Sequence, residues 1–322
     1  MKQLQATVRD AGMCMLVAAL VVTIGSAPSA STRHQGTLRA RLSSGTAVHP
    51  LVSVHGPLVV AVGDVACPHG ARRTATSCRD AATAREARHY HPRFAFLLGD
   101  EQYDRATRRD FRKGYRRTWG VRALKPITRP VPGNHEYETP HAAGYFWFFR
   151  HRTRRPGYYA FNVRNWRIYA LNSNCAKISC RAENKWLRRD MTRHPRRCSA
   201  LMMHHPLYSS GAEHGDSSQG HRFWVTGLRH HADLVLAGHD HDYERFRRMN
   251  ASGHASRTGM VSFVVGTGGN SLGGSRGRRA GSRIFYNHRA GVLALRLGRH
   301  RFGWRFTSIA GHTIDKGIRR CV

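Results

Sequence analysis

The sequence predicts an α/β fold, a sandwich of sheets and helices, and three observations support this. Apolar, β-branched runs alternate with helical patterns in the early part of the chain. Strand patterns dominate the late part. Several apolar runs end directly in Asp, Asn or His, which is where open α/β sheets place their sites.

Strands are predicted where short apolar runs are bounded by turn residues. These runs cover residues 58–62, 94–98, 158–163, 166–171, 199–203, 233–237, 260–265, 291–297 and 302–309. The runs 158–163 and 166–171 are predicted to pair as a hairpin. Helices are predicted over residues 79–90, 104–118, 181–193 and 218–231. The glycine-rich stretch 266–274 departs from the dinucleotide-binding pattern at Ser271, and it is predicted to be a loop.

The first residues have the layout of an export signal. Lys2 and Arg9 precede an apolar run over 11–24, and small residues follow it. A membrane anchor would need about 20 apolar residues, so cleavage is favoured over an uncleaved anchor. We therefore expect a signal peptide over 1–30, a flexible linker over 31–55 and one domain over 56–322. The mature chain is expected to be secreted and to lack a membrane span.

Six cysteines remain after the expected cleavage, and an even number in an exported chain suggests disulfides. Six cysteines allow 15 pairings, among which sequence alone does not choose. We favour the two local pairs, Cys67 with Cys78 and Cys175 with Cys180, which leaves Cys198 with Cys321. No CxxC motif is present, so a zinc ribbon is not supported.

The chain is strongly basic. Its formal net charge is +34, and its 53 basic residues comprise 47 Arg and 6 Lys. Such a field attracts polyanions such as nucleic acid or anionic cell-wall polymers, as well as phosphorylated substrates. A bias toward arginine codons on an ordinary soluble surface explains the charge equally well. Both interpretations stay open.

Five motifs carry side chains that bind metals, and each follows a turn or an apolar strand. Asp64 alone suits a turn, and His204 alone suits a buried histidine, so neither is specific by itself. The motifs are Gly63-Asp64, Gly99-Asp100-Glu101-Gln102-Tyr103, Gly133-Asn134-His135-Glu136, His204-His205-Pro206 and Gly238-His239-Asp240-His241. Their order and spacing together indicate a single site.

This mixture of residue types suits two metal ions. Two ions about 3.5–4 Å apart can clamp a phosphoryl group and activate a water molecule. A carboxylate can bridge them, while imidazole and amide ligands add affinity without adding negative charge. A phenolate such as that of Tyr103 favours a hard trivalent ion.

With these motifs the chain resembles the calcineurin-like metallophosphoesterases and, within them, secreted bacterial proteins similar to purple acid phosphatases. The resemblance covers about residues 58–270. It implies a four-layer α/β/β/α sandwich of two mixed sheets flanked by helices. It also implies hydrolysis of phosphate monoesters, in which a metal-bound hydroxide attacks phosphorus in line, on a phosphorylated small-molecule substrate.

The resemblance implies a role for each matched residue. Fe(III) in the first site would be held by Asp64, Tyr103 and His241, with Asp100 as the bridge. Zn, Mn or Fe(II) in the second site would be held by Asn134, His204 and His239. His135 and His214 would act in catalysis, and the substrate would contact Asn134, His135, His205 and His214.

Two departures from the family leave alternatives open. Glu101 stands where close relatives often carry Asn, and it would either alter metal preference or face solvent. His205 neighbours His204, so the choice of His204 as the ligand rests on its spacing from Pro206.

Two other functions remain to be weighed against a phosphatase. A phosphodiesterase or nucleotidase would use the same centre, because pocket walls rather than metal ligands set that choice. A polyanion-binding pseudoenzyme would use the positive charge and a degenerate site. All seven ligand positions are filled, which favours an enzyme.

Overall fold

The computed structural model describes residues 54–322. The expected signal peptide, 1–30, and all but the last two residues of the expected linker, 31–55, lie outside this range. Among the described residues, no helix combines the length and the apolar character needed to cross a bilayer.

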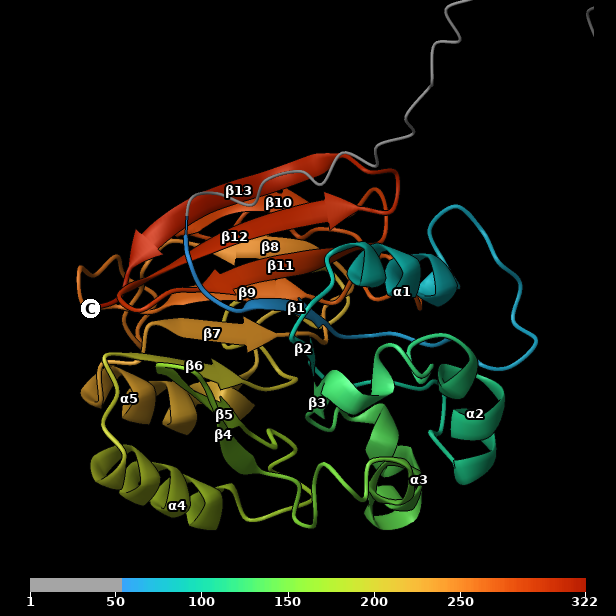
Figure 1. Ribbon diagram of the computed structural model, residues 1–322, viewed down its shortest axis with the longest axis horizontal. Helices are drawn as coiled ribbons and strands as arrows, with labels where there is room; N and C mark the ends of the chain where they lie inside the picture. The colour runs from blue at the N-terminus through green and yellow to red at the C-terminus, as the bar shows by residue number, and fades with distance from the viewer. Residues whose placement is uncertain (1–53) are drawn as a thin grey trace, which may run out of the picture. The chain divides into compact units, whose positions relative to one another are not determined.

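The first sheet places two parallel strands, β1 (Leu58–Val62) and β2 (Phe94–Leu97), in its interior (Figure 1). Both strands are buried apart from the half-exposed Phe94, which explains why their sequences are continuous apolar runs. The sheet has six strands in the order β13-β12-β11-β1-β2-β3. The other strands are β3 (Thr128–Pro130), β11 (Gly291–Leu297), β12 (Arg301–Ser308) and β13 (Thr313–Arg320).

The second sheet has seven strands in the order β10-β8-β9-β7-β6-β5-β4. Its middle strands β5, β6, β7 and β9 are parallel, and β4 and β8 pair antiparallel with their neighbours. The strands are β4 (Tyr159–Val163), β5 (Trp166–Ala170), β6 (Cys198–Met202), β7 (Leu234–Ala237), β8 (Tyr243–Phe246), β9 (Val261–Val265) and β10 (Ser282–Tyr286).

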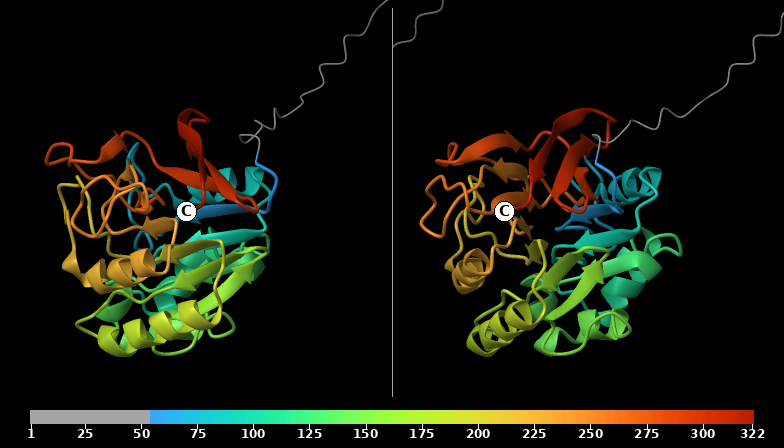
Figure 2. Two further views of the ribbon diagram at one scale, coloured as in Figure 1. Left: turned by 90° about the vertical axis from the view of Figure 1, so that its left-hand side faces the viewer. Right: turned by 60° about the vertical axis from the view of Figure 1, so that its left-hand side comes forward.

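Helices flank the two sheets and complete the predicted layers. Helices α1 (Asp80–His89), α2 (Arg108–Lys113) and α3 (Ala143–Phe148) lie beside the first sheet, and α4 (Cys180–Arg193) and α5 (His221–Arg229) lie beside the second. Short 3₁₀ turns occupy Tyr115–Arg117, Lys125–Ile127, His135–Glu138, Pro140–Ala142 and Ser218–Gly220. Figure 2 shows α4 (yellow-green) and the C-terminal hairpin β12–β13 (red) on opposite sides of the described part of the chain. The predicted fold class, two mixed sheets with flanking helices, is confirmed.

Two apolar cores hold the layers together. The larger core joins residues of both sheets, such as Val60 of β1 and Ile168 of β5, to the side chains of α1 to α3. The smaller core packs α4 and α5 on the second sheet through residues such as Leu187 and Phe223. Burial of these side chains is the main stabilising contribution to the fold.

The predicted helix over 104–118 is much shorter in the structure. Thr107 caps α2, because its hydroxyl accepts from the backbone N–H of Asp110 while the Asp110 carboxylate accepts from the N–H of Thr107. The helix ends at Lys113, ahead of Gly114. A side chain at Gly114 would collide with Gln102, whose side-chain oxygen would lie 2.1 Å from the added carbon. Packing against the Gln102 loop therefore requires glycine at the position where this helix ends.

Three disulfides link the six cysteines in the favoured pairing. Cys67 bonds to Cys78, Cys175 to Cys180, and Cys198 to Cys321. The last bond ties the start of β6 to the C-terminal end of the chain, across 123 residues of sequence. Closing long loops in this way restricts the unfolded chain and so stabilises the folded one.

Candidate metal centre

Four predicted ligands lie at one edge of the sandwich, just past the ends of parallel strands. Asp64 follows β1 and Asp100 follows β2, and these strands are parallel neighbours. His204 follows β6 and His239 follows β7, which are also parallel neighbours. The carboxyl ends of parallel strands meet at the same edge of a sheet, so the topology brings these loops together.

Three of these residues have left-handed backbone angles that side chains other than glycine rarely adopt. Their φ angles are 60° for Asp64, 51° for Asp100 and 75° for His239. Such strain is retained where the surroundings hold a residue in place, and it is concentrated at functional sites.

The glycine of the Gly133-Asn134-His135-Glu136 motif is required by close packing. A side-chain carbon at Gly133 would lie 2.0 Å from Oδ1 of Asp100. Only glycine lets the two loops approach this closely.

The first group of donor atoms surrounds the Tyr103 hydroxyl. Its oxygen lies 2.9 Å from Oδ1 of Asp64, 3.1 Å from Oδ2 of Asp100 and 3.0 Å from Nε2 of His241. These four residues come from three separate loops. They are the set that the resemblance assigned to the first metal, together with its bridge.

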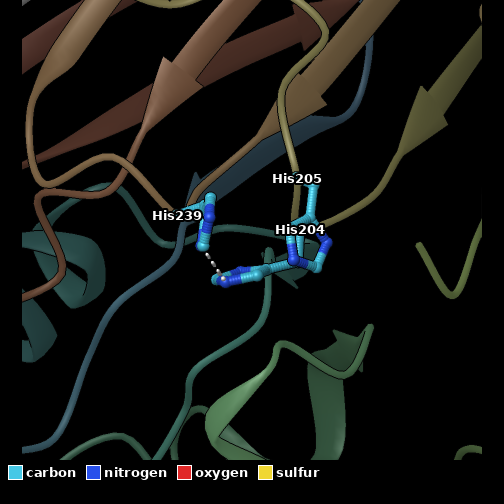
Figure 3. Close-up of side chains that lie close together, drawn as sticks. All are labelled: His204, His205 and His239. Carbon is cyan, nitrogen blue, oxygen red and sulfur yellow. Dashed lines mark hydrogen bonds between the residues drawn. The ribbon is translucent and has the colours of Figure 1, made fainter. Parts of the chain in front are cut away.

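The second group surrounds Nε2 of His204, which lies 2.9 Å from Oδ1 of Asn134 and 3.1 Å from Nδ1 of His239. Figure 3 shows the His204 and His239 rings facing each other. The same nitrogen lies 3.3 Å from Oδ2 of Asp100. That carboxylate oxygen therefore belongs to both groups of donors.

The donor set fits metal ions. Zinc bonds to nitrogen and oxygen of about 2.0–2.2 Å place neighbouring ligand atoms about 2.9–3.5 Å apart, which matches the separations above. Nδ1 of His204 lies 2.8 Å from the carbonyl oxygen of Leu98 and donates to it. In the neutral ring, Nε2 then directs its lone pair toward the oxygens of Asn134 and Asp100. Such a convergence of lone pairs is stable only with a metal ion or a proton between them.

Without metal, Asp100 and His204 form a buried ion pair. Burial would raise the pKa of Asp100, but the charges of His204 and His135 outweigh it and hold that pKa below its usual range. Burial would likewise lower the pKa of His204, but Asp100 raises it to about 9. A metal ion that binds here must displace the His204 proton.

His241 is oriented by two residues that the sequence did not reveal as part of the site. Its Nδ1 lies 2.8 Å from the Ser271 hydroxyl and 3.0 Å from Oε2 of Glu213. A proton on Nδ1 leaves the lone pair on Nε2, the atom that faces Tyr103 and Asp64. Ser271 lies in the glycine-rich loop, so that loop supports the metal centre.

The orienting contacts of His241 lead to a prediction. Ser271→Ala or Glu213→Ala alone should have little effect, because the other acceptor still holds the Nδ1 proton. The double variant should lower the affinity of the first metal site about 10- to 100-fold, since the imidazole loses its fixed orientation. Metal titration of the four proteins, with Ser252→Ala as the surface control, measures this. Equal losses in the two single variants and no further loss in the double variant would contradict it.

Glu136 ties together the loops that carry Asp100 and Asn134. Its carboxylate accepts from the backbone N–H groups of Asp100 at 2.9 Å, Glu101 at 3.0 Å and Gly133 at 2.7 Å. Burial raises the pKa of Glu136 to about 7. The last residue of the Gly133-Asn134-His135-Glu136 motif therefore positions the loop that carries the Asp100 carboxylate.

One of the two expectations for Glu101 was that it faces solvent, and this is wrong. Its side chain is fully buried, and neither carboxylate oxygen has a hydrogen-bond partner among the described residues. Burial, reinforced by the neighbouring charge of Glu136, raises the pKa of Glu101 well above its usual range. Glu101 is therefore a buried carboxyl group next to Asp100.

The three histidines expected near substrate lie around the two donor groups. His135 packs on Tyr103 with ring centroids 4.2 Å apart, and its Nε2 lies 4.0 Å from Oδ2 of Asp100. His214 is exposed and stacks on His239 at 3.8 Å. His205 is 3% exposed and bonds through Nδ1 to Ser173 at 2.8 Å. His205 is thus the most enclosed of the three.

Comparison with known proteins shows the class to which this fold and site belong. The family model for calcineurin-like phosphoesterase matches residues 57–243, which is more than half of the chain. The protein therefore belongs to the calcineurin-like phosphoesterase family, a family of phosphoric ester hydrolases.

The curated relatives that align with the chain include purple acid phosphatases. Purple acid phosphatase 23 of Arabidopsis thaliana is 29% identical over 172 residues, which are 47% of this chain and 37% of that protein. Purple acid phosphatase 21 of the same plant is 31% identical over 36% of this chain and 28% of its own length. The phosphoenolpyruvate phosphatase of Allium cepa is 29% identical over 42% of this chain and 30% of its own length. These matches span about a third of each relative.

Solved structures share the fold at low sequence identity. The purple acid phosphatase PPD1 from yellow lupin seeds aligns with a TM-score of 0.65 at 14% identity, over 83% of this chain and 54% of its own. GAP50, the anchor in the inner membrane complex of Plasmodium, aligns with a TM-score of 0.62 at 13% identity, over 83% of this chain and 89% of its own. At these identities the likeness shows the fold alone.

Proposed function

We propose that the protein is an exported phosphatase that hydrolyses phosphate monoesters at a centre of two metal ions. The observation that carries this proposal is the position of Oδ2 of Asp100, which lies 3.1 Å from the Tyr103 hydroxyl oxygen and 3.3 Å from Nε2 of His204, between the two groups of candidate ligand atoms. The purple acid phosphatases among the curated relatives support the same activity. The substrate would be a phosphorylated small molecule.

The proposed metals follow from the two donor groups. The phenol oxygen of Tyr103 and the carboxylates of Asp64 and Asp100 suit Fe(III), a hard ion, in the first site. The imidazoles of His204 and His239 suit Zn, Mn or Fe(II) in the second. When bound, two such ions hold the phosphoryl group and activate the attacking water.

His135 is the proposed proton donor to the leaving oxygen. Its Nδ1 lies 2.6 Å from the carbonyl oxygen of Asp104 and donates to it. Nε2 is then the free atom of the ring, and it points to the side of Asp100. The imidazolium can donate from Nε2 to an ester oxygen held over the centre. His135 is half-buried, so a substrate can reach it.

His214, Asn134 and His205 are the proposed substrate contacts. His214 lies outermost, since its exposed ring stacks on His239 and can turn one edge toward a bound phosphate. Asn134 is half-buried, and its amide nitrogen remains available when its oxygen faces His204. His205 would lie deeper in the site than these two residues, because it is buried and hydrogen-bonded to Ser173.

Export is proposed from the N-terminal pattern and from the disulfides. Three disulfides suit an oxidising compartment, and they are rare in cytosolic proteins. The proposed layout is a signal peptide over 1–30, a linker over 31–55 and the phosphoesterase domain over 56–322.

A comparison of substrates tests the proposed activity. We expect the metal-loaded mature protein to hydrolyse an aryl phosphate monoester faster than the matching bis-aryl diester by at least about tenfold. Steady-state kcat/KM for both esters, measured on one preparation with quantified metals, checks this. A preference for the diester would instead indicate a phosphodiesterase or nucleotidase. Inactivity on both esters with metals bound would indicate a polyanion-binding protein.

A further inference from the structure

A second cleft, lined mostly by arginines, lies where β8, β10, β12 and β13 meet the loop 247–257. Its volume is about 610 Å³, and none of its lining residues belongs to the metal centre. Figure 1 shows these four strands together, far from α4. Within the part of the chain that the structure describes, no acidic residue lines the cleft, while its arginines are Arg245, Arg247, Arg248, Arg257, Arg283 and Arg319.

Two of these arginines are held in place around a buried tryptophan. Arg245 makes a two-pronged ion pair with Asp315, at 2.6 Å from Nε and 3.0 Å from Nη2. The guanidinium carbon of Arg245 lies 4.8 Å from the centre of the Trp304 ring, and that of Arg319 lies 5.9 Å from it. The Trp304 indole N–H also donates to Asp315, at 2.9 Å. Stacking and ion pairing therefore preorganise this wall of the cleft.

Arg248 is fixed by backbone carbonyls and has no ion pair. Its guanidinium donates to the carbonyl oxygens of Gly259, at 3.1 Å, and Arg320. Burial lowers the pKa of Arg248, the negative charge of Asp233 opposes this, and the nearby positive charge of Arg319 lowers the pKa further. Among residues 54–322, no carboxylate lies at ion-pairing distance from this half-buried arginine, so its charge is only partly balanced within the protein.

The cleft as a whole carries excess positive charge. Arg247, Arg257 and Arg283 are exposed, and no acidic side chain within residues 54–322 lies at ion-pairing distance from any of them. Within residues 54–322, Asp315 pairs with Arg245 and the charge of Asp233 acts on Arg248, which leaves most of the charge of the six arginines unbalanced. A concave surface lined by one sign of charge focuses the electrostatic field. A composition rich in arginine explains scattered surface charge, but it does not explain arginines fixed around a hollow.

We propose that this cleft binds a linear oligophosphate, a short chain of linked phosphate groups. Guanidinium groups match phosphate oxygens in a two-pronged geometry, and several linked phosphates can balance the excess charge within one small volume. The volume lies in the range of small-molecule sites. The aromatic residues of the cleft, Phe246 and Trp304, are 0% and 2% exposed, so nucleic-acid bases have no ring on which to stack. This proposal does not rest on the phosphatase activity.

Calorimetric titration with inorganic tripolyphosphate tests the proposal. The proteins are the wild type, the cleft variant Arg257→Gln/Arg283→Gln and a matched variant, Arg181→Gln/Arg188→Gln. The matched variant loses the same charge from exposed positions on α4. Tripolyphosphate also chelates metals, so the metal content is quantified before and after each titration. Orthophosphate and a short oligothymidylate serve as comparison ligands.

We expect saturable binding of tripolyphosphate to the wild type and to the α4 variant. The cleft variant should bind it about 100-fold more weakly, since two charge-assisted contacts are lost. Its melting temperature and its aryl phosphate kcat should be unchanged, because neither arginine touches the metal centre. Equal weakening in the cleft and α4 variants would overturn the proposal, as would binding of oligothymidylate but not of tripolyphosphate.

Discussion

Asp100→Asn should abolish turnover, with kcat at least about 1,000-fold lower, and the metal content should fall below two ions per chain. Two metal ions supply several kcal/mol of transition-state stabilisation, and each 1.36 kcal/mol corresponds to a factor of ten in rate. An amide in place of Oδ2 cannot bridge two cations. If the amide turns the other way, its nitrogen faces the backbone N–H of His135, which now donates to Oδ1 at 2.9 Å.

The near-identical shapes of Asp and Asn make this variant informative. Asp104→Asn is the matched control, because it removes an exposed carboxylate four residues away whose side chain contacts neither donor group. Circular dichroism and the melting temperature check that both variants fold. Wild-type activity in Asp100→Asn would show that the centre lies elsewhere.

His135→Ala should lower kcat about 100- to 10,000-fold and leave the metal content unchanged. The range is that of general acid catalysis by a positioned side chain. The metals should stay, because Nε2 of His135 lies 4.0 Å from Oδ2 of Asp100 and outside both donor groups. The backbone N–H that supports Asp100 is retained in the variant.

The leaving group separates proton donation by His135 from simple positioning. A nitrophenyl ester, whose leaving oxygen needs little protonation, should lose much less rate than an alkyl phosphate. His151→Ala, at an exposed position, serves as the control. A parallel loss of rate and metals would make His135 a structural support of the centre. An equal loss of rate on both esters, with the metals retained, would make it a binding residue.

The predicted strands that held best were those buried on both faces. The run Leu58–Val62 coincides with β1, because apolar side chains at every position leave no other placement for the segment. β8 was missed, since Tyr243–Phe246 contains Glu244 and Arg245 and reads as polar. In the fold, Glu244 is buried and accepts from the backbone N–H and the hydroxyl of Ser210. These hydrogen bonds offset the burial of the Glu244 carboxylate. They come from a residue 34 positions away, so the local sequence pattern does not reveal them.

The predicted ligands come together in the structure for a similar reason. Each follows a segment whose burial is evident from the sequence. The rule that sites lie at the carboxyl ends of strands therefore predicted that these residues lie close together. Glu213 and Ser271 escaped prediction because they belong to loops without periodicity. They meet His241 only through the pairing of Gly211 with Ser275 and the packing of the glycine-rich loop. Supporting residues of a metal centre are set by tertiary structure, and so they are harder to predict than the ligands.

The number and coupling of bound metal ions test the shared position of Asp100. The measurement is elemental analysis of the purified mature protein, with activity followed as metal is returned to the metal-free chain and with electron paramagnetic resonance at each step. We predict two ions per chain, activity that appears only when both are bound, and magnetic coupling between paramagnetic ions that share one carboxylate. Full activity with a single ion, or two ions without coupling, would contradict the proposed centre.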